Sequence, residues 1–321
     1  MKPGPLPRVV PVFVWTLVVF LSIASIGDAQ GLEFARESQQ EHSPHSMEAV
    51  QFIHTATASN ITSNWTVIDN PVTNNHPDAI LLVTPNWNPG GGGGVYNDHA
   101  IGVWYTGTRW AIFNQDIAAM PEGAHFNVLV APAGPRVFVH NATADNIASN
   151  GTRIDSSLTN GHPEAIVLVT PNWNPGGGGG TYNNHPIGVI YNDDGQWAVF
   201  NQDMAHMPEG AHFNVFIAPA DPSVFVHTAT ASNIAENWTV IDHPLTNGRP
   251  NAIVLATSNW KPGGGWGGTY DNHAIGVGYD GTRWTVFNQD MANMPEGAHF
   301  NVVVFQGTTK VYLPMVLRAL P

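Results

Sequence analysis

The sequence predicts an all-β protein built from three tandem repeats of about 86 residues, each a small antiparallel β-sandwich or barrel-like domain. His54, His140 and His227 open three copies of one unit, and the block FNQDIAAMPEGAHFNV of the first copy returns almost unchanged in the other two. Short β-type runs alternate with Asn, Pro and Gly clusters, and no run of helical period exceeds about two turns. A period of this length is the size of a small domain, and it is too long for a propeller blade or a helical-repeat unit.

The composition indicates a folded protein and narrows its chemistry. Of the 321 residues, 43% are hydrophobic and 11% are charged, and 11 Trp, 14 Phe and 7 Tyr suffice for a core, which excludes a disordered polyelectrolyte. Lys and Arg number 11 against 24 Asp and Glu, and the resulting net charge of -13 argues against a nucleic-acid partner. Because the chain has no Cys, disulfides, Cys-ligated zinc and thiol catalysis are excluded.

The N-terminal segment is predicted to direct export. Residues 1–29 have the features of a signal peptide, because Lys2 and Arg8 precede an apolar run that ends at small residues. We therefore expect a secreted or cell-surface protein with no membrane contact after cleavage. The apolar run is close to spanning length, so an uncleaved anchor stays open as an alternative. Residues 30–49 are polar and aperiodic, and they are interpreted as a flexible leader.

Three repeat domains are predicted to follow, at residues 50–135, 136–222 and 223–307. In the first copy, strands are expected at 51–57, 65–69, 79–84, 100–105, 109–113 and 125–131. The turn TGT at 106–108 suits a tight hairpin, so the strands on either side of it are expected to be antiparallel neighbours. In the last strand, alternation puts His125, Asn127 and Leu129 on one face and the apolar residues between them on the other.

The C-terminal tail, residues 308–321, restarts the repeat. Its segment KVYL at 310–313 matches the RVFV and SVFV segments that open the second and third copies. We expect each such strand to pair with the domain before it, so that residues 310–313 complete the last copy. The alternative is a terminus left over from duplication.

The motifs FVHTATASNI, NWTVID, NWNPGGGGGTYNNHPIGV and FNQD with MPEGAHFNV resemble a domain of unknown function that occurs in tandem in secreted bacterial proteins. The YLPMVLR ending is similar to tails of bacterial surface-exported proteins. The resemblance implies export and a bacterial source, and it brings no catalytic residue or ligand with it. The second copy departs from the pattern at Gly151 and Arg153, where the other copies have Trp and Val. One further position varies between the copies and is expected to be exposed: Trp104, Ile190 and Gly278.

The Gly-rich loops provide the first candidate site: PNWNPGGGGG at 85–94 and 171–180, and SNWKPGGGWGG at 258–268. None has the Gly-Lys-Ser/Thr of a phosphate-binding loop. A loop Trp can stack on a sugar ring while neighbouring Asn amides bond its hydroxyls, which makes these residues candidate ligand-binding groups. The candidates are Trp87 with Asn86, Trp173 with Asn172, and Trp260 with Asn259. The alternative is that each Trp closes the end of a sandwich and the glycines only connect strands.

Recurring His and carboxylate residues provide the second candidate site. His54, His99, His125 and Asp116, with their equivalents in the other copies, are donors that zinc accepts, and calcium through Asp and Asn oxygens is equally compatible. No HxH, HExxH or EF-hand pattern occurs, so a metal site would have to be assembled from separate strands. Hydrogen-bonded structural roles are therefore the favoured interpretation.

The sequence gives less support to a catalytic site than to the two candidate sites above. Asp69 and Asp116, with their equivalents, could supply the two carboxylates of a glycosidase. Both follow strands and precede turn residues, which favours turn capping. A Ser-His-Asp triad is disfavoured because no GxSxG occurs and Asp145 stands in the second copy where the others have Ser.

These patterns together predict an exported, non-enzymatic protein that binds a surface or matrix component, with polysaccharide as the favoured ligand, through three equivalent loops. Linked weak sites raise avidity, whereas an enzyme gains little from three copies of one active site. Two alternatives stay open: an architectural cell-surface spacer, and a secreted glycan hydrolase that uses Asp and His in each copy. No cofactor is expected beyond the open question of calcium or zinc.

Overall fold

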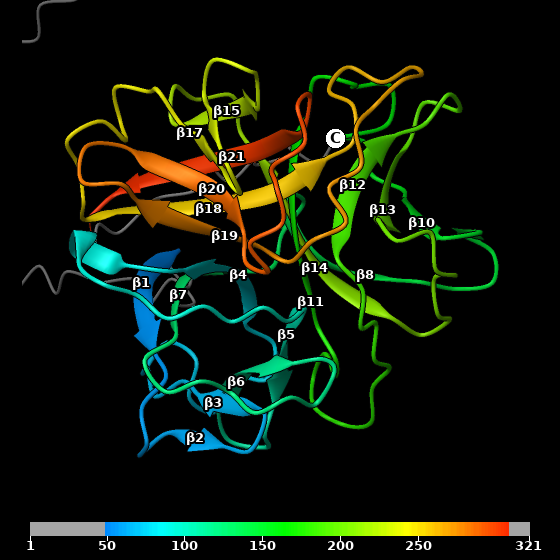
Figure 1. Ribbon diagram of the computed structural model, residues 1–321. Coiled ribbons are helices and arrows are strands. Elements are labelled where there is room, and N and C mark those ends of the chain that lie inside the picture. The colour runs from blue at the N-terminus through cyan, green and yellow to red at the C-terminus, as the bar shows by residue number, and fades with distance from the viewer. Residues whose placement is uncertain (1–48, 308–321) are drawn as a thin grey trace, which may run out of the picture. The chain divides into compact units, whose positions relative to one another are not determined.

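The computed structural model describes residues 49–307, which belong to one compact unit that contains all three repeats (Figure 1). The predicted export signal, nearly all of the predicted leader and the tail from residue 308 lie outside the described residues. Within residues 49–307, no helix is long or apolar enough to cross a membrane.

Each repeat contributes seven strands in the same order, so the all-β prediction is confirmed. Repeat 1 contains β1 (Val50–Thr55), β2 (Ile61–Thr62), β3 (Trp65–Val67), β4 (Ile80–Asn86), β5 (Ile101–Tyr105), β6 (Trp110–Asn114) and β7 (His125–Ala131). Repeat 2 contains β8 (Val137–Asn141), β9 (Ile147–Ala148), β10 (Gly151–Ile154), β11 (Ile166–Pro171), β12 (Ile187–Tyr191), β13 (Trp197–Asn201) and β14 (His212–Ala218). Repeat 3 contains β15 (Val224–Thr228), β16 (Ile234–Ala235), β17 (Trp238–Val240), β18 (Ala252–Asn259), β19 (Ile275–Tyr279), β20 (Trp284–Asn288) and β21 (His299–Gln306). One short 3-10 turn, η1 (Pro89–Gly91), is the sole helix of the described range.

Each repeat is a sandwich of two antiparallel sheets around a core of its own. In repeat 1 the strands β1-β7-β4 form one sheet and β2-β3-β6-β5 form the other. Leu81, Trp110 and Phe126 are fully buried between these sheets, and equivalent cores fill the other two repeats. The hairpin predicted around TGT is confirmed, because β5 and β6 pair antiparallel and Gly107 has a φ of 105° in their turn.

The sheets do not stop at the boundaries between repeats. The sheet β1-β7-β4 of repeat 1 continues, through a parallel pairing of β4 with β19, into the four-stranded sheet of repeat 3 (Figure 1). In the same way β18 of repeat 3 pairs in parallel with β12 of repeat 2. Asn172, which follows β11 of repeat 2, pairs in parallel with Val103 of repeat 1. Strand pairing therefore runs in a closed cycle through the three repeats.

A fourth hydrophobic core lies where the three repeats meet. Its members come from strands that are buried on both faces, which is typical of strands covered on two sides. In β4, Leu81 faces the core of its own repeat while Leu82 faces the shared core, together with Leu168 and Leu255 from the other repeats. Leu129 of β7 also belongs to the shared core. The face of β7 predicted to carry His125, Asn127 and Leu129 therefore points toward the other repeats.

Buried threonines bond the repeats together at this junction. Thr84 of repeat 1 accepts the Ala256 N–H of repeat 3 at 3.0 Å, and its hydroxyl donates to the Ala256 carbonyl at 3.3 Å. The equivalent bonds run from Val83 N–H to Thr170 at 2.9 Å and from Val169 N–H to Thr257 at 3.1 Å. Each repeat thus satisfies backbone groups that would otherwise be buried without a partner.

The strand that opens each copy pairs inside its own repeat, which corrects the expected pairing with the preceding domain. β8 of the RVFV segment pairs with β14, and β15 of the SVFV segment pairs with β21. The physical reason is that β7, the strand before the first linker, already has β1 on one edge and β4 on the other. No free edge is left there for β8. The expected strand at 310–313 lies outside the described residues.

Candidate functional site

The Gly-rich loops clasp a neighbouring repeat. The loop of repeat 2 lies on repeat 1, where Trp173 N–H donates to Val103 O at 2.8 Å. Asn174 holds Tyr105 through both ends of its amide, because Oδ1 accepts the Tyr105 N–H at 2.7 Å and Nδ2 donates to the Tyr105 carbonyl at 2.9 Å. Asn88 of repeat 1 holds Tyr279 of repeat 3 in the same manner, at 2.7 Å for both bonds.

The glycines shape this clasp and are more than a connection between strands. A Cβ on Gly180 would lie 1.6 Å from the carbonyl oxygen of Trp173, so only glycine fits there. Gly177 has a φ of 76°, and a Cβ on it would meet the Tyr105 ring at 3.3 Å. Gly179, between them, faces open space. Each Gly-rich loop joins its own repeat to a neighbour, and this structural role explains why the same loop sequence recurs in the three copies.

The predicted Asn partners of a sugar lie inside the protein. Asn172 is 2% exposed, and its Nδ2 donates to Asn214 Oδ1 at 2.9 Å. Asn214 Nδ2 in turn donates to the Leu81 carbonyl of repeat 1 at 2.9 Å. Asn86 and Asn259 are bonded equivalently, to Asn127 and Asn301. This placement corrects the expectation that these amides face a ligand, because each side chain is buried and its amide nitrogen already donates to another asparagine of the protein.

The three loop tryptophans are half-buried, with the indole N–H turned inward and without a hydrogen-bond partner among the described residues. Each ring packs against a Tyr of its own loop, with ring centroids 5.7 Å apart for Trp173 and Tyr182. The equivalent pairs are Trp87 with Tyr96 and Trp260 with Tyr270. These tryptophans can therefore offer part of a ring surface to a ligand, and no polar atom.

A row of three tryptophans crosses from repeat 1 to repeat 2. Strand register places Trp65 opposite Phe113 and Trp104 opposite Ala111, so both indoles stand on the outer face of the sheet β2-β3-β6-β5. The Trp65 and Trp104 rings are 5.2 Å apart and nearly perpendicular. Trp104 is 6.1 Å from Trp173 of repeat 2, which completes the row.

Two neighbouring hollows lie beside Trp65 and Trp104, and we name them together the aromatic groove. The first has a volume of about 630 Å³, and its walls include Thr62, Trp65, Asn74, Trp104, Thr108 and Arg109. The second has a volume of about 690 Å³ and reaches Asn174 and glycines 176–178 of the loop of repeat 2. The two share Asn75, Trp104 and Thr106. The groove thus combines aromatic surface with amide and hydroxyl groups.

The same face differs in the other two repeats. In repeat 2, Gly151 and Ile190 replace the two sheet tryptophans, and a smaller hollow of about 300 Å³ is left. In repeat 3, Trp238 is kept and Gly278 replaces the second Trp. The positions that vary between copies therefore line one face. This variation was the sequence signal for the groove, although the sequence did not show that Trp65 and Trp104 meet.

The first recurring histidine is a buried structural residue. His54 is 8% exposed, and its Nε2 donates to the hydroxyl of Thr66 at 2.7 Å. That hydroxyl donates on to Asn60 Oδ1 at 2.9 Å, which fixes the direction of the chain of bonds. Burial lowers the pKa of His54 to about 4, and nearby His125 contributes to the lowering. His140 and His227 have the same bond, and burial lowers their pKa to about 4 as well.

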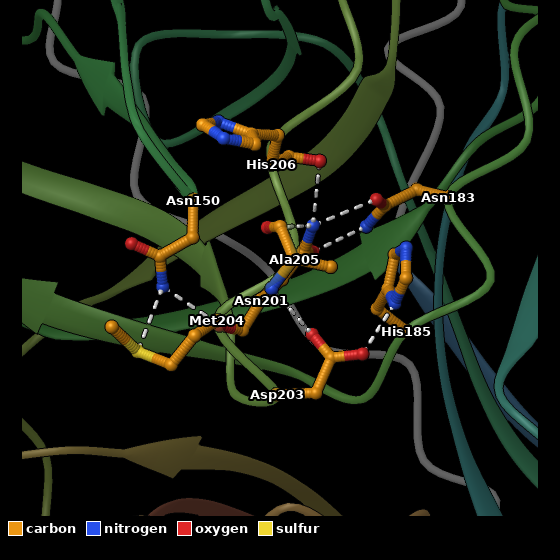
Figure 2. A network of polar contacts seen from close by, with 8 residues as sticks. All are labelled: Asn150, Asn183, His185, Asn201, Asp203, Met204, Ala205 and His206. Carbon is orange, nitrogen blue, oxygen red and sulfur yellow. Dashed lines mark hydrogen bonds and ion pairs between the residues drawn. The ribbon is translucent and has the colours of Figure 1, made fainter.

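The second recurring histidine pairs with an aspartate. His99 Nδ1 lies 2.6 Å from Asp116 Oδ2, and the equivalent His185 and Asp203 of repeat 2 are also 2.6 Å apart (Figure 2). Asp203 Oδ1 accepts the Ala205 N–H at 3.0 Å, so the predicted turn capping is present. The three His rings of these pairs line a small cavity, of about 80 Å³, where the repeats meet.

Paired asparagines hold the turn that carries this aspartate. Asn183 Nδ2 donates to Asn201 Oδ1 at 2.7 Å, and Asn201 Nδ2 donates to the Ala205 carbonyl at 3.2 Å (Figure 2). The turn holds Met204 at a φ of 66°, a backbone conformation that is costly for a residue other than glycine. Local hydrogen bonds therefore sustain a strained turn beside each His–Asp pair.

No group of three or more His, Cys, Asp or Glu side chains between residues 49 and 307 is placed to hold a metal ion. Among the predicted metal candidates, the structure brings His99 to Asp116 and sets His54 near His125. These are two separate pairs, and hydrogen bonds within the protein already occupy one nitrogen of His54 and one of His99.

Repeat 3 has one substitution in the paired asparagines. Asp271 stands where repeat 2 has Asn183, and it is 2% exposed. Neither carboxylate oxygen has a good hydrogen-bond partner in the described structure, and the facing Asn288 Oδ1 has none either. Burial raises the pKa of Asp271 to about 6, although the nearby His273 and the Asn288 side chain oppose the shift. A protonated Asp271 would supply the donor that the asparagine supplies elsewhere.

Replacing Asp271 with Asn is expected to raise the free energy of unfolding near neutral pH by about 2–3 kcal/mol. Burial raises the pKa of this carboxyl from its ordinary value of 3.8 to about 6, so the native protein loses stability as pH rises through that window. The gain from D271N should therefore vanish below about pH 4. Urea unfolding at several pH values measures this. The converse variant N183D should lose a similar amount, and a gain from D271N that is independent of pH would contradict the assignment.

The fold and the groove define an all-β protein of three sandwich repeats that share sheets in a closed cycle, with an aromatic groove where the first two repeats meet. The chain belongs to the family described as a domain of unknown function (DUF7452), whose model matches residues 43–130, 108–208 and 192–304. The expected resemblance to a tandem domain of unknown function is thus confirmed. No match was found among curated proteins or among solved structures.

Proposed function

We propose that the protein is an exported, non-enzymatic polysaccharide-binding protein whose ligand lies in the aromatic groove. The observation that carries this proposal is the row of Trp65, Trp104 and Trp173 beside open hollows lined by Asn and Thr. Indole rings pack on the apolar faces of sugar rings, while amides and hydroxyls bond the sugar hydroxyls. Export rests on the N-terminal signal pattern of residues 1–29.

The size of the groove favours a stretch of a sugar chain over a single sugar. Its two hollows, of about 630 and about 690 Å³, are open to solvent and have Trp104 as a shared wall residue. A chain that follows both hollows would contact sheet tryptophans of repeat 1 and the Gly-rich loop of repeat 2. The ligand class that fits is therefore a polysaccharide of several linked sugars.

In this proposal the three repeats do not supply three equivalent binding sites that act by avidity. The groove is built from two repeats, and only the first repeat carries both sheet tryptophans. We therefore expect one strong site for each chain, with the other two faces weaker or different in specificity. An isolated repeat should bind much more weakly than the whole chain, because it lacks half of the groove.

Replacing Trp104 with Ala is expected to weaken polysaccharide binding by about 30-fold or more, because a central aromatic contact is commonly worth about 2 kcal/mol. W65A should have a similar effect. W238A, on the equivalent strand of repeat 3, is the matched control and should leave binding close to that of the native chain. Co-sedimentation and calorimetry on a panel of cell-envelope polysaccharides measure the affinity, and circular dichroism checks the fold. Equal losses from W104A and W238A would contradict a single groove in repeat 1.

A secreted glycan hydrolase is the second candidate, and the His–Asp pairs are the observation that favours it. His185 Nδ1 bonded to Asp203 leaves the other ring nitrogen free to act as a base. Sugar released into the supernatant, and lost in a D203N variant that stays folded, would support turnover. Binding without release supports the binding protein. Neither binding nor release would favour the architectural spacer.

A further inference from the structure

We infer that the aromatic groove selects uncharged polysaccharides, and that Asp69 is the residue that sets this selectivity. The inference rests on the proposed polysaccharide-binding function and adds the class of ligand. It follows from the charges at the groove, which are few and are already paired within the protein.

Among residues 49–307, Arg109 is the one charged side chain that lines the two hollows of the groove. Its Nη2 lies 3.3 Å from Asp69 Oδ2. The other oxygen of the same carboxylate accepts Asn74 Nδ2 at 2.7 Å. Asp69 therefore neutralises the guanidinium and also positions an amide of the groove wall.

A charged ligand gains little at such a site. A ligand carboxylate would have to displace Asp69 from Arg109 or remain beside it, and like charges at this range repel each other. The net charge of the chain, -13, adds to that repulsion. A neutral sugar chain meets indole rings, amides, hydroxyls and an Arg109 side chain whose charge is already paired, so its binding depends little on salt.

Repeat 3 provides a matched position for testing this role. Asp242 accepts Asn247 Nδ2 at 2.7 Å, as Asp69 does with Asn74. The face of repeat 3 has Gly278 in place of the second groove tryptophan. A change from Asp to Asn keeps an acceptor for the neighbouring amide at both positions, and it removes the charge. Among the described residues, Asp69 is ion-paired with Arg109 of the groove wall whereas Asp242 makes no ion pair with a Lys or Arg side chain, so only D69N changes the pairing of a groove cation.

The experiment measures binding of the native chain, D69N and D242N to a neutral glucan or mannan and to a polyuronate of similar length. The native chain should bind a neutral polymer with an affinity that changes less than about twofold between roughly 0.05 and 0.5 M NaCl. It should bind the polyuronate at least about tenfold more weakly. D69N should gain about tenfold toward the polyuronate, because Arg109 is freed to pair with a carboxylate, and salt should remove the gain. D242N should behave as the native chain.

The inference and the proposed function fail in different arms of this experiment. Native binding to the polyuronate that is as tight as to a neutral polymer, and is lost in W65A, would overturn the charge selectivity and leave polysaccharide binding in place. D69N without any gain, or with the same gain as D242N, would also overturn the role of Asp69. Absence of binding to every polysaccharide by the native chain would overturn the proposed function itself.

Discussion

Between about pH 6.5 and pH 4, the protein is expected to lose most of its stability and to unfold cooperatively. The cause is burial, which lowers the pKa of three histidines from 6.5 to about 4: His54, His140 and His227. Because the unfolded chain binds protons more tightly than the folded protein in this window, stability falls as pH falls. Each histidine contributes about 3 kcal/mol at pH 4, so the three together remove about 9 kcal/mol, which is comparable to the whole stability of an ordinary domain.

Other titrating groups change this result little. Burial also lowers the pKa of His125, His212 and His299, which adds to the loss in acid. Asp271 and Asp98 act in the opposite sense, because burial raises the pKa of both carboxyls and so favours the folded protein in acid, but they are two groups against six histidines.

Chemical unfolding followed by Trp fluorescence at several pH values measures the slope. H227Q, which keeps a donor for Thr239, should reduce the proton uptake on unfolding by about one. A stability that is flat from pH 6.5 to pH 4 would contradict the structural role of these histidines.

Replacing Gly180 with Ala is expected to lower the free energy of unfolding by about 3–5 kcal/mol. A Cβ at this position would lie 1.6 Å from the Trp173 carbonyl oxygen, and backbone on both sides would have to move. The loop that would move also carries Asn174, which holds Tyr105 of repeat 1. The substitution should therefore weaken the contact between repeats 1 and 2, as well as the local turn.

Gly179 is the matched control for this prediction. A Cβ there would meet nothing within 4 Å, so G179A should change stability by less than about 0.5 kcal/mol. Thermal and urea unfolding compare the two variants, and limited proteolysis at the repeat junction reports whether the closed cycle has opened. Equal effects of G179A and G180A would show that loop entropy matters more than the close approach to Trp173.

The closed cycle explains why the three repeats stabilise one another. A single repeat would expose the edge of β4 or its equivalent, and half of a shared hydrophobic core. Each Gly-rich loop covers a neighbour, and buried Thr and Asn side chains complete bonds across each junction. Function can then differ between faces while the junctions stay alike. The two tryptophans of repeat 1, against Gly151 and Ile190 of repeat 2, are such a difference.

The sequence by itself determined the fold class, the three repeats and the local pairing. The β5–β6 hairpin followed from the turn residues at 106–108, because positive φ at glycine is a local property of the chain. The turn-capping role of Asp116 and its equivalents followed for the same reason, since an Asp side chain bonds backbone within a few residues. Such features depend on neighbours along the chain, and the sequence displays them.

The tertiary structure alone decided what lies between repeats. Asn172 has the sequence surroundings of a loop residue beside a tryptophan, yet its amide is buried, and its partner Asn214 reaches a carbonyl of repeat 1. The opening strand of each copy pairs within its own repeat because β7 has no free edge, which follows from the order of strands in the sheets. The meeting of Trp65, Trp104 and Trp173 likewise depends on strand register and on the cycle of repeats. Contacts between residues far apart in the chain are set by packing as a whole, and no local pattern encodes them.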